Sequence, residues 1–187
     1  MEIQARKLTG VYEITPLPKF DQRGFFMRTY DEELFKQYGL DRHWVQENHS
    51  RSERSGIIRG LHFQFPPFAE TKLIRCIKGT IWDIFVDLRK GSPTFGQWDA
   101  LEISEDNKKM VFIPRGFAHG FCTISDVSEV VYKVDNWYSA KNEGGLLWCD
   151  SDLNIEWPVK QPILSAKDNI NMKLADFIDR YGSIEVS

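Results

Sequence analysis

The sequence predicts a mainly β protein, a jelly-roll sandwich or barrel with a few short helices. Two observations support this fold class. Short β-rich segments recur between Trp44 and Trp157, and turn signals such as Lys78-Gly79 and Pro114-Arg115-Gly116 separate them. Many short strands at regular spacing are typical of antiparallel sandwiches and barrels. A parallel doubly wound sheet would need helices between its strands, and the sequence indicates none in this region.

Seven segments of this stretch are expected to be strands because they are rich in β-branched and aromatic residues and are bounded by turn residues. They are residues 57–65, 71–77, 80–88, 97–103, 110–113, 121–124 and 130–134. A jelly roll built from such strands encloses a cavity, and the alternation of side chains along each strand decides which residues enter it.

Two helices are expected outside the β-rich stretch. Asp31 is a suitable N-cap for a helix over 32–38 that Gly39 ends. Near the C-terminus, apolar residues at helical spacing over 172–181 predict a second helix that ends at Gly182.

Length and charge exclude several classes of protein. The chain has 187 residues, the size of one domain. With 24 Lys and Arg against 27 Asp and Glu, its formal net charge is −3, which argues against a nucleic-acid binder or a polybasic membrane anchor. The N-terminus has no apolar signal region, and no apolar run reaches the length of a membrane span. We therefore expect one domain over residues 1–187 in a cytoplasmic protein, with no nucleic-acid or membrane partner.

The cysteines favour the same compartment. Cys76, Cys122 and Cys149 are odd in number, widely spaced, and form no CxxC pair. We expect free, buried thiols in a reducing cytoplasm.

Two polar residues stand out on the expected strands. Tyr132 alternates in phase with Val130 and Val134, and Lys72 alternates in phase with Ile74 and Cys76. Both could therefore lie inside the barrel, where a polar group is costly unless it has a partner. The alternative is that these strands turn Tyr132 and Lys72 to solvent.

The histidines raise the possibility of a metal site. Of the four (His43, His49, His62 and His119), two lie in apolar, glycine-flanked segments, Arg59-Gly60-Leu61-His62-Phe63-Gln64 and Pro114-Arg115-Gly116-Phe117-Ala118-His119. The second segment resembles the second metal-binding motif of the cupin superfamily. The first motif would need a His-x-His pair followed by Glu, whereas this chain has His62-x-Gln64 with Glu70 further on. Two histidines, a glutamine and a glutamate are a weak ligand set, so we predict no metal.

A proton-transfer site is the better hypothesis. His62 can serve as a base near neutral pH, and Tyr132 can serve as an acid. Lys72 can stabilise an enolate oxygen as a fixed cation. A carboxylate is needed to orient the histidine, and both Asp168 and Asp83 are candidates that spacing does not separate.

Eight short blocks, in order from about Gly10 to Asp168, resemble the dTDP-4-dehydrorhamnose 3,5-epimerase family. The blocks are residues 21–26, 45–50, 59–64, 72–75, 83–89, 113–121, 132–133 and 164–168. The resemblance implies a metal-free, cofactor-independent, cupin-like jelly roll that acts as a homodimer. It also implies a nucleoside-diphosphate 4-keto sugar as substrate.

The resemblance assigns roles to individual residues. His62 matches the base, Asp168 its carboxylate partner, Lys72 the residue that stabilises the enolate, and Tyr132 the opposing acid. Arg23 and Arg59 match arginines that face the diphosphate, with Arg23 crossing from the partner subunit. The full set of expected substrate-binding residues is Arg23, Phe26, Arg28, Gln46, Asn48, Arg59, His119, Tyr138, Glu143 and Lys167.

The chemistry expected is epimerisation at C3 and C5 of dTDP-4-dehydro-6-deoxy-D-glucose. The chain departs from the family where Arg28 replaces a usual Glu, and where Phe68 and Glu70 replace common His and Gln. Alternatives are therefore a C3-only or C5-only epimerase, or an enzyme for a GDP- or CDP-linked 4-keto sugar or heptose. A non-catalytic sugar-nucleotide binding module is disfavoured because it would not need the acid–base pair. A metal-dependent cupin oxygenase is disfavoured because Gln64 stands where the motif needs its second histidine.

The spacing of Arg59 and His62 adds one structural expectation. The two are an odd number of residues apart, so a regular strand would place them on opposite faces. We expect a bulge or bend at Gly60 if both reach the cleft; otherwise Arg59 reaches the substrate over the rim.

Overall fold

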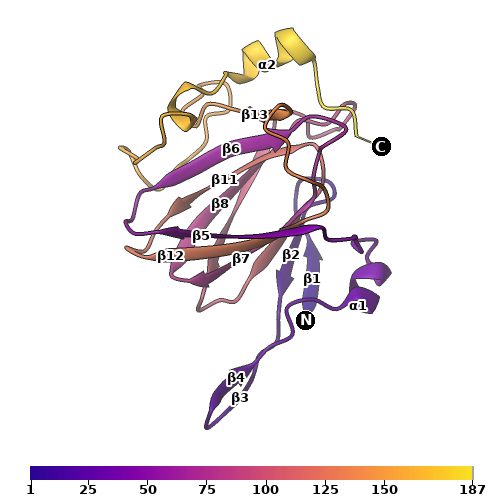
Figure 1. The fold of residues 1–187 in the computed structure, drawn as a ribbon, viewed down its shortest axis with the longest axis vertical. Coiled ribbons are helices and arrows are strands. Elements are labelled where there is room, and N and C mark those ends of the chain that lie inside the picture. The colour runs from indigo at the N-terminus through magenta and orange to yellow at the C-terminus, as the bar shows by residue number, and fades with distance from the viewer. Residues whose placement is uncertain (187) are drawn as a thin grey trace.

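Two antiparallel sheets face each other in the computed structural model, which describes residues 1–186 (Figure 1). The first sheet has six strands in the order β1-β2-β10-β7-β12-β5. Its strands are β1 (Glu2–Ala5), β2 (Tyr12–Thr15), β5 (Gln46–Ser52), β7 (Lys72–Lys78), β10 (Met110–Ile113) and β12 (Ser128–Val134). The mainly β jelly-roll prediction is therefore confirmed.

The second sheet has five strands in the order β13-β6-β11-β8-β9. These are β6 (Ile58–Gln64), β8 (Thr80–Asp87), β9 (Trp98–Ser104), β11 (Phe117–Thr123) and β13 (Glu143–Gly145). A separate hairpin of β3 (Lys19–Asp21) and β4 (Gly24–Phe26) extends away from both sheets at the bottom of Figure 1. The helical elements are α1 (Glu32–Gln37), the 3₁₀ turn η1 (Asp168–Ile170) and α2 (Leu174–Tyr181).

Apolar side chains fill the space between the sheets. Ile74, Val111 and Val130 from the first sheet and Phe85 and Phe121 from the second belong to one buried cluster. Burying a side chain of this size stabilises the fold by about 1.5–3 kcal/mol. This cluster holds the sheets together along part of their length. The polar cavity described below lies in the remaining space between them.

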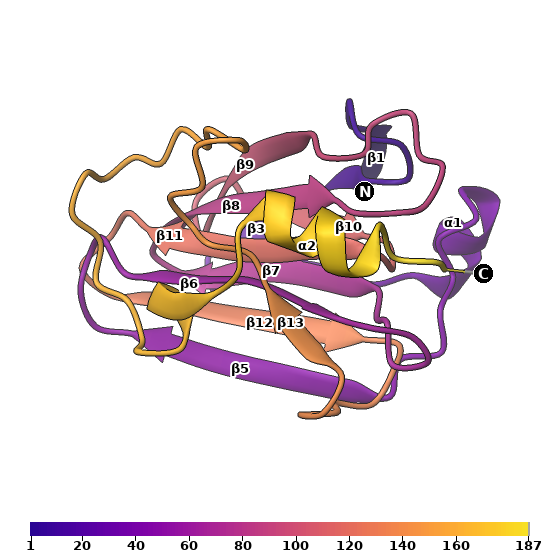
Figure 2. The same ribbon diagram turned by 90° about the horizontal axis from the view of Figure 1, so that it is seen from above.

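The helices cover the outer faces of the sheets. α2 lies across the five-stranded sheet (Figures 1 and 2), and its Leu174 and Phe177 are buried against Phe63 and Ile84. α1 packs Phe35 against Phe112 and its neighbours on the first sheet.

Both predicted helices are confirmed, with shifted bounds. Asp31 caps α1 by accepting a hydrogen bond from the Leu34 N–H at 3.3 Å. The C-terminal helix begins at Leu174 instead of 172 and ends before Gly182, whose N–H donates to the Ile178 carbonyl. Ile178 and Tyr181 remain about 40% exposed, so only part of the predicted apolar stripe is buried.

All seven predicted strands are present, and six of them have bounds within two residues of those expected. The strand expected over 121–124 is β11, which already begins at Phe117. Gly120 lies in its middle because β6 approaches so closely that a Cβ there would be 2.7 Å from the Arg59 carbonyl. Glycine at this position is therefore required for strand packing.

Several strands were not predicted. β1 to β5 and β13 are short or rich in polar residues, as in β5, whose sequence is QENHSRS. β5 is stabilised by its pairing with β12, from Gln46 opposite Val134 to Ser52 opposite Ser128. Such pairing depends on backbone hydrogen bonds, which need no alternation of apolar residues. The sequence of β5 therefore carries no strand signal.

The cysteine expectation holds for two residues and is wrong for the third. Cys76 and Cys122 are free and buried, and burial raises the pKa of each thiol to about 11. Cys149 is free but exposed because it lies in a turn after β13 that no sheet covers. Over residues 1–186, no helix is long and apolar enough to cross a membrane.

The β7–β8 turn yields a test of the fold. Gly79 has a φ of +73°, and a Cβ there would be 2.2 Å from the Val127 carbonyl oxygen. We expect Gly79→Ala to lower the free energy of unfolding by about 3 kcal/mol or more, measured by urea denaturation, since strain and a clash combine. Gly39 has a similar φ of +69° with no atom within 4 Å, so Gly39→Ala should cost only about 1–2 kcal/mol. Equal losses in the two variants would contradict this account.

Candidate active site

A cavity of about 280 Å³ opens between the two sheets. Its lining comes from β5, β7 and β12 on one side, from β6 and β11 on the other, and from the segment that leads into η1. The lining residues are Ser50, Arg59, His62, Lys72, His119, Phe121, Tyr132, Ser165, Lys167 and Asp168. The structure thus brings together the four residues predicted to be catalytic.

His62 is held by Asp168. Its Nε2 lies 2.5 Å from Asp168 Oδ1, and the Asp168 side chain is only 5% exposed. Burial works to raise the pKa of Asp168, but the hydrogen bond and charge of His62 outweigh it and lower that pKa. The carboxylate therefore stays ionised and can orient His62 and stabilise its protonated form. Of the two candidate partners for His62, Asp168 is the one in contact.

Asp83 serves the other histidine of the cavity. Its Oδ2 lies 2.9 Å from His119 Nε2, and the side chain is fully buried in β8. Burial raises the pKa of Asp83, although the charges of His119 and Lys72 oppose the shift. Its second oxygen, Oδ1, is buried without a hydrogen-bond partner.

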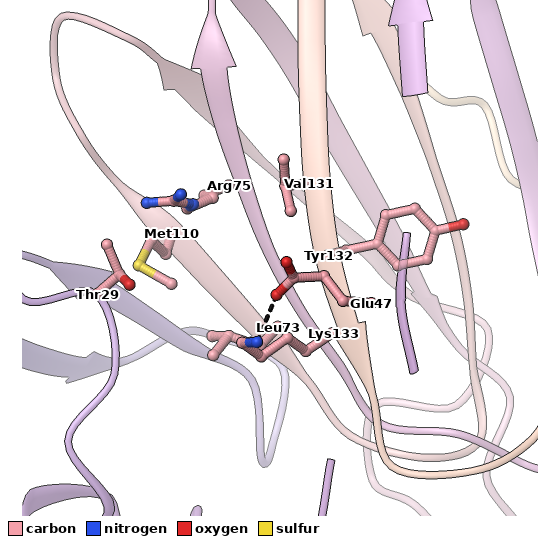
Figure 3. A pocket seen from close by; sticks show the side chains of 8 residues that line it. All are labelled: Thr29, Glu47, Leu73, Arg75, Met110, Val131, Tyr132 and Lys133. Atoms are coloured by element: carbon pink, nitrogen blue, oxygen red, sulfur yellow. Dashed lines mark ion pairs between the residues drawn. The ribbon is translucent and has the colours of Figure 1, made fainter. Parts of the chain in front are cut away.

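Lys72 and Tyr132 enter the cavity from the first sheet. The Lys72 side chain is 11% exposed, and its Nζ lies 2.5 Å from Glu70 Oε1 and 5.5 Å from the centre of the Tyr132 ring. Figure 3 shows the Tyr132 ring pointing away from Glu47 and Lys133, which lie on the outer face of the same sheet. The expectation of inward-facing Lys72 and Tyr132 is confirmed, and the solvent-facing alternative is wrong.

The expected base and the expected acid come from opposite sheets. His62 lies on β6 of the five-stranded sheet, and Tyr132 lies on β12 of the six-stranded sheet. Because both line one cavity, a flat ring held between the sheets would present one face to each residue. Lys72, also in the lining, can place a positive charge at the edge of that ring.

The predicted irregularity at Gly60 is present. Gly60 has a φ of +121°, and the β6–β11 register shifts between His119 and Phe121. A Cβ on Gly60 would be 2.6 Å from the Gly120 Cα, so at this point the two strands approach more closely than side chains would permit. The bend allows both Arg59 and His62 to line the cavity, despite their odd separation.

Gln64, considered above as a weak metal ligand, has another role. Its side-chain N–H groups lie within hydrogen-bond distance of the Phe68 and Trp137 carbonyls and of Glu70, and its Oε1 accepts from the Ser139 N–H at 2.6 Å. The amide thus joins two loops at the end of the barrel. Within residues 1–186, no group of three or more His, Cys, Asp or Glu side chains is arranged to hold a metal ion.

Several predicted binding residues form a polar rim. Glu143 Oε2 accepts a hydrogen bond from the Tyr138 hydroxyl at 2.9 Å and lies 2.6 Å from Lys167 Nζ. Burial acts to raise the pKa of Glu143, but Lys167 and Tyr138 lower it overall. Gln46 accepts from the Tyr138 N–H, and Asn48 lies opposite Tyr132 on β5.

Three predicted residues lie away from both the cavity and its rim. Arg23 and Phe26 are exposed on the β3–β4 hairpin, which extends away from the barrel (Figure 1). Arg23 pairs with Asp21 there, and Arg28 pairs with Asp31 at the start of α1.

Three lining residues were not predicted. Ser50 and Phe121 are two positions from Asn48 and His119, so strand alternation would have placed them on the same faces. Ser165 is three residues before Asp168, and its Oγ accepts a hydrogen bond from the Asp168 N–H at 3.1 Å. The turn that contains Ser165 has no periodic pattern in the sequence, so alternation could not have identified this residue.

The fold and the site together define a class of protein: a cupin-like jelly-roll isomerase equipped for proton transfer next to a carbonyl. A family model described as dTDP-4-dehydrorhamnose 3,5-epimerase matches residues 5–176. The chain belongs to this family.

Individual relatives agree with this assignment. The chain is 49% identical over 177 residues to dTDP-4-dehydrorhamnose 3,5-epimerase of Shigella flexneri, covering 94% of this chain and 97% of the relative. It superposes with a TM-score of 0.92 and 35% identity on dTDP-6-deoxy-D-glucose-3,5-epimerase of Legionella pneumophila in complex with dTDP-4-keto-L-rhamnose, covering 100% and 98% of the two chains. It is also 36% identical over 180 residues to dTDP-4-dehydrorhamnose 3-epimerase of Streptomyces niveus, covering 96% and 86%.

The His62–Asp168 pair predicts a pH-dependent contribution to stability. Because the folded-state pKa of Asp168 is lowered, its contribution is present above the unfolded-state value of about 3.9 and is lost as pH falls through the folded-state value. We expect Asp168→Asn to lower the free energy of unfolding at pH 7 by about 1–3 kcal/mol, as for a hydrogen bond to a charged group, and to change it little at the acid end.

Urea denaturation of both proteins between pH 7 and pH 3 measures this difference. Asp21→Asn is the control, because the pKa of Asp21 is also lowered, by Arg23, but on the exposed hairpin. A loss in Asp168→Asn that is as large at pH 3 as at pH 7 would contradict the ionic contribution.

Proposed function

We propose that this chain epimerises C3 and C5 of dTDP-4-dehydro-6-deoxy-D-glucose, giving dTDP-4-dehydro-L-rhamnose. The observation that carries the proposal is the placement of His62 and Tyr132 on opposing sheets around one cavity with Lys72 in its lining. The names of the relatives and the ligand of the Legionella enzyme support the same substrate class.

The reaction follows from the positions of these groups. The C4 ketone acidifies the hydrogens on C3 and C5, and His62 takes one of them as a proton. The electron pair of the broken C–H bond moves to O4, where the Lys72 ammonium stabilises the enolate. Tyr132 then gives its proton to the opposite face of the same carbon, which inverts it.

Asp168 supports this cycle without touching the sugar. Ionised and hydrogen-bonded to His62, it stabilises the imidazolium that proton removal creates. Protons move while the oxidation state of the sugar is unchanged overall, so the scheme uses no redox cofactor.

The charged rim supports recognition of the diphosphate. Arg59 and Lys167 line the mouth of the cavity and are candidates to bind its oxygens. Glu143 and Tyr138 hold Lys167 in place. His119, anchored by Asp83, is positioned to donate a hydrogen bond to the sugar.

The remaining predicted residues require a second copy of the chain. Phe20, Phe25 and Phe26 are 51–72% exposed on the β3–β4 hairpin, a concentration of rings that is typical of an interface. We propose a homodimer in which this hairpin and the segment that follows it bring Arg23, Phe26 and Arg28 to the nucleotide in the partner's cavity.

The product would enter dTDP-rhamnose biosynthesis and serve lipopolysaccharide or capsule assembly. The free thiols at Cys76, Cys122 and Cys149 fit the proposed cytoplasmic location, where cysteines stay reduced.

A single-site epimerase is the second candidate. The relative from Streptomyces niveus is named as a 3-epimerase, and both activities use the same proton chemistry. Arg28 and the Phe68–Glu70 loop, where this chain departs from the family, are the positions that favour a changed specificity.

Incubation with dTDP-4-keto-6-deoxy-D-glucose in D2O tests the proposed reaction. We expect NMR to show deuterium at both C3 and C5, because each inverted carbon receives its new hydrogen from solvent-exchanged groups. Label at one carbon alone would identify a single-site epimerase. Exchange only with a GDP- or CDP-linked 4-keto sugar would overturn the dTDP assignment.

Two variants test the roles of base and acid. His62→Ala should lower exchange at every carbon by about 10²–10⁴-fold, as expected for loss of a general base. Tyr132→Phe should impair net inversion more than it impairs initial proton loss, because His62 can still exchange the hydrogen on its own face. Persistent exchange in His62→Ala, or equal damage to both steps in Tyr132→Phe, would argue against these assignments.

A further inference from the structure

The mechanism above leaves one buried ionic group unexplained. Glu70 lies in the loop before β7, its side chain is 12% exposed, and its Oε1 is 2.5 Å from the Lys72 ammonium. The attraction within an ion pair so sheltered from water is stronger than in bulk water.

Glu70 is fixed in place by the barrel. Its second oxygen, Oε2, accepts a hydrogen bond from Gln64 Nε2 at 3.0 Å. Gln64 is itself 4% exposed and bound to the Trp137 carbonyl and the Ser139 N–H. The carboxylate therefore cannot follow Lys72 if the ammonium moves towards a ligand.

Lys72 has a second carboxylate within the range of its charge. Asp83 is fully buried, its Oδ1 has no partner, and the charge of Lys72 acts on it. The other titratable groups around the ammonium are Tyr132 from β12, His119 from β11 and His62 from β6. In contrast to these groups and to Asp83, Glu70 is in direct ionic contact with Lys72.

We propose that Glu70 is a positioning residue that holds the Lys72 ammonium in the cavity and balances its charge until the enolate forms. The inference rests on the proposed function, in which Lys72 stabilises the enolate oxygen. Glu70 and that oxygen then share one cation. The carboxylate fixes the ammonium in position, and in exchange it weakens the attraction of Lys72 for the enolate.

Glu70→Gln separates the two effects because Gln keeps the shape and a hydrogen-bond acceptor but removes the charge. We expect KM to stay close to the wild-type value, because the residues that bind the nucleotide are unchanged. At the pH optimum, kcat should rise about threefold, because the enolate no longer competes with a carboxylate for the ammonium.

Glu70→Ala removes the contact as well as the charge. It should lower kcat about ten- to a hundredfold with KM little changed, because the ammonium is no longer held in position. Tight dTDP binding, measured by calorimetry, would show that this variant is folded. In a Lys72→Ala background, Glu70→Ala should lower the residual exchange no further, which assigns the effect to Lys72.

The matched control is Glu47→Gln. Glu47 pairs with Lys133 beside the same strand β12, but on the outer face of the sheet (Figure 3). Its kcat and KM should equal those of the wild type. An equal loss of kcat in both Glu70 variants, or a wild-type kcat in Glu70→Ala, would overturn this inference alone. Absence of exchange in the wild-type enzyme would overturn the proposed function and this inference together.

Discussion

Polar groups inside the barrel are stable only with partners, and this constraint shapes the site. Three ionic pairs meet it: His62 with Asp168, His119 with Asp83, and Lys72 with Glu70. An unpartnered charge at such a depth would cost several kcal/mol. Each pair avoids this cost and also holds a side chain of the site in position. The chemistry of the cavity and the stability of the fold therefore depend on the same contacts.

The two-sheet architecture converts these pairs into an arrangement suited to inversion. A single sheet presents its inward side chains to one side of a ligand, whereas two facing sheets present them to both sides. With His62 on β6 and Tyr132 on β12, the fold places the proposed base and the proposed acid on opposing sheets. Glycines at positions 60 and 120 permit the close approach of β6 and β11 that turns Arg59 and His62 to the same cavity.

Prediction from sequence succeeded where the signal is local. The central strands alternate or are continuously apolar, and Asp31 and Gly39 mark the ends of the first helix, so these elements were found. It failed where pairing partners are distant: β5 is polar throughout and is a strand because β12 lies beside it. The alternation of Lys72 and Tyr132 indicated that they share a face with apolar residues, but the direction of that face depended on the opposing sheet.

By itself, the sequence determined the fold class, the residue types for proton transfer and the family to which the chain belongs, because these reside in composition, periodicity and short motifs. The tertiary structure decided which carboxylate serves which histidine: Asp168 meets His62 although 106 positions separate them, while Asp83 meets His119. It also decided that Glu70, two residues from Lys72, contacts the Lys72 ammonium and is anchored by Gln64. Contacts of this kind arise from the packing of strands and loops in space, and spacing along the chain does not record them.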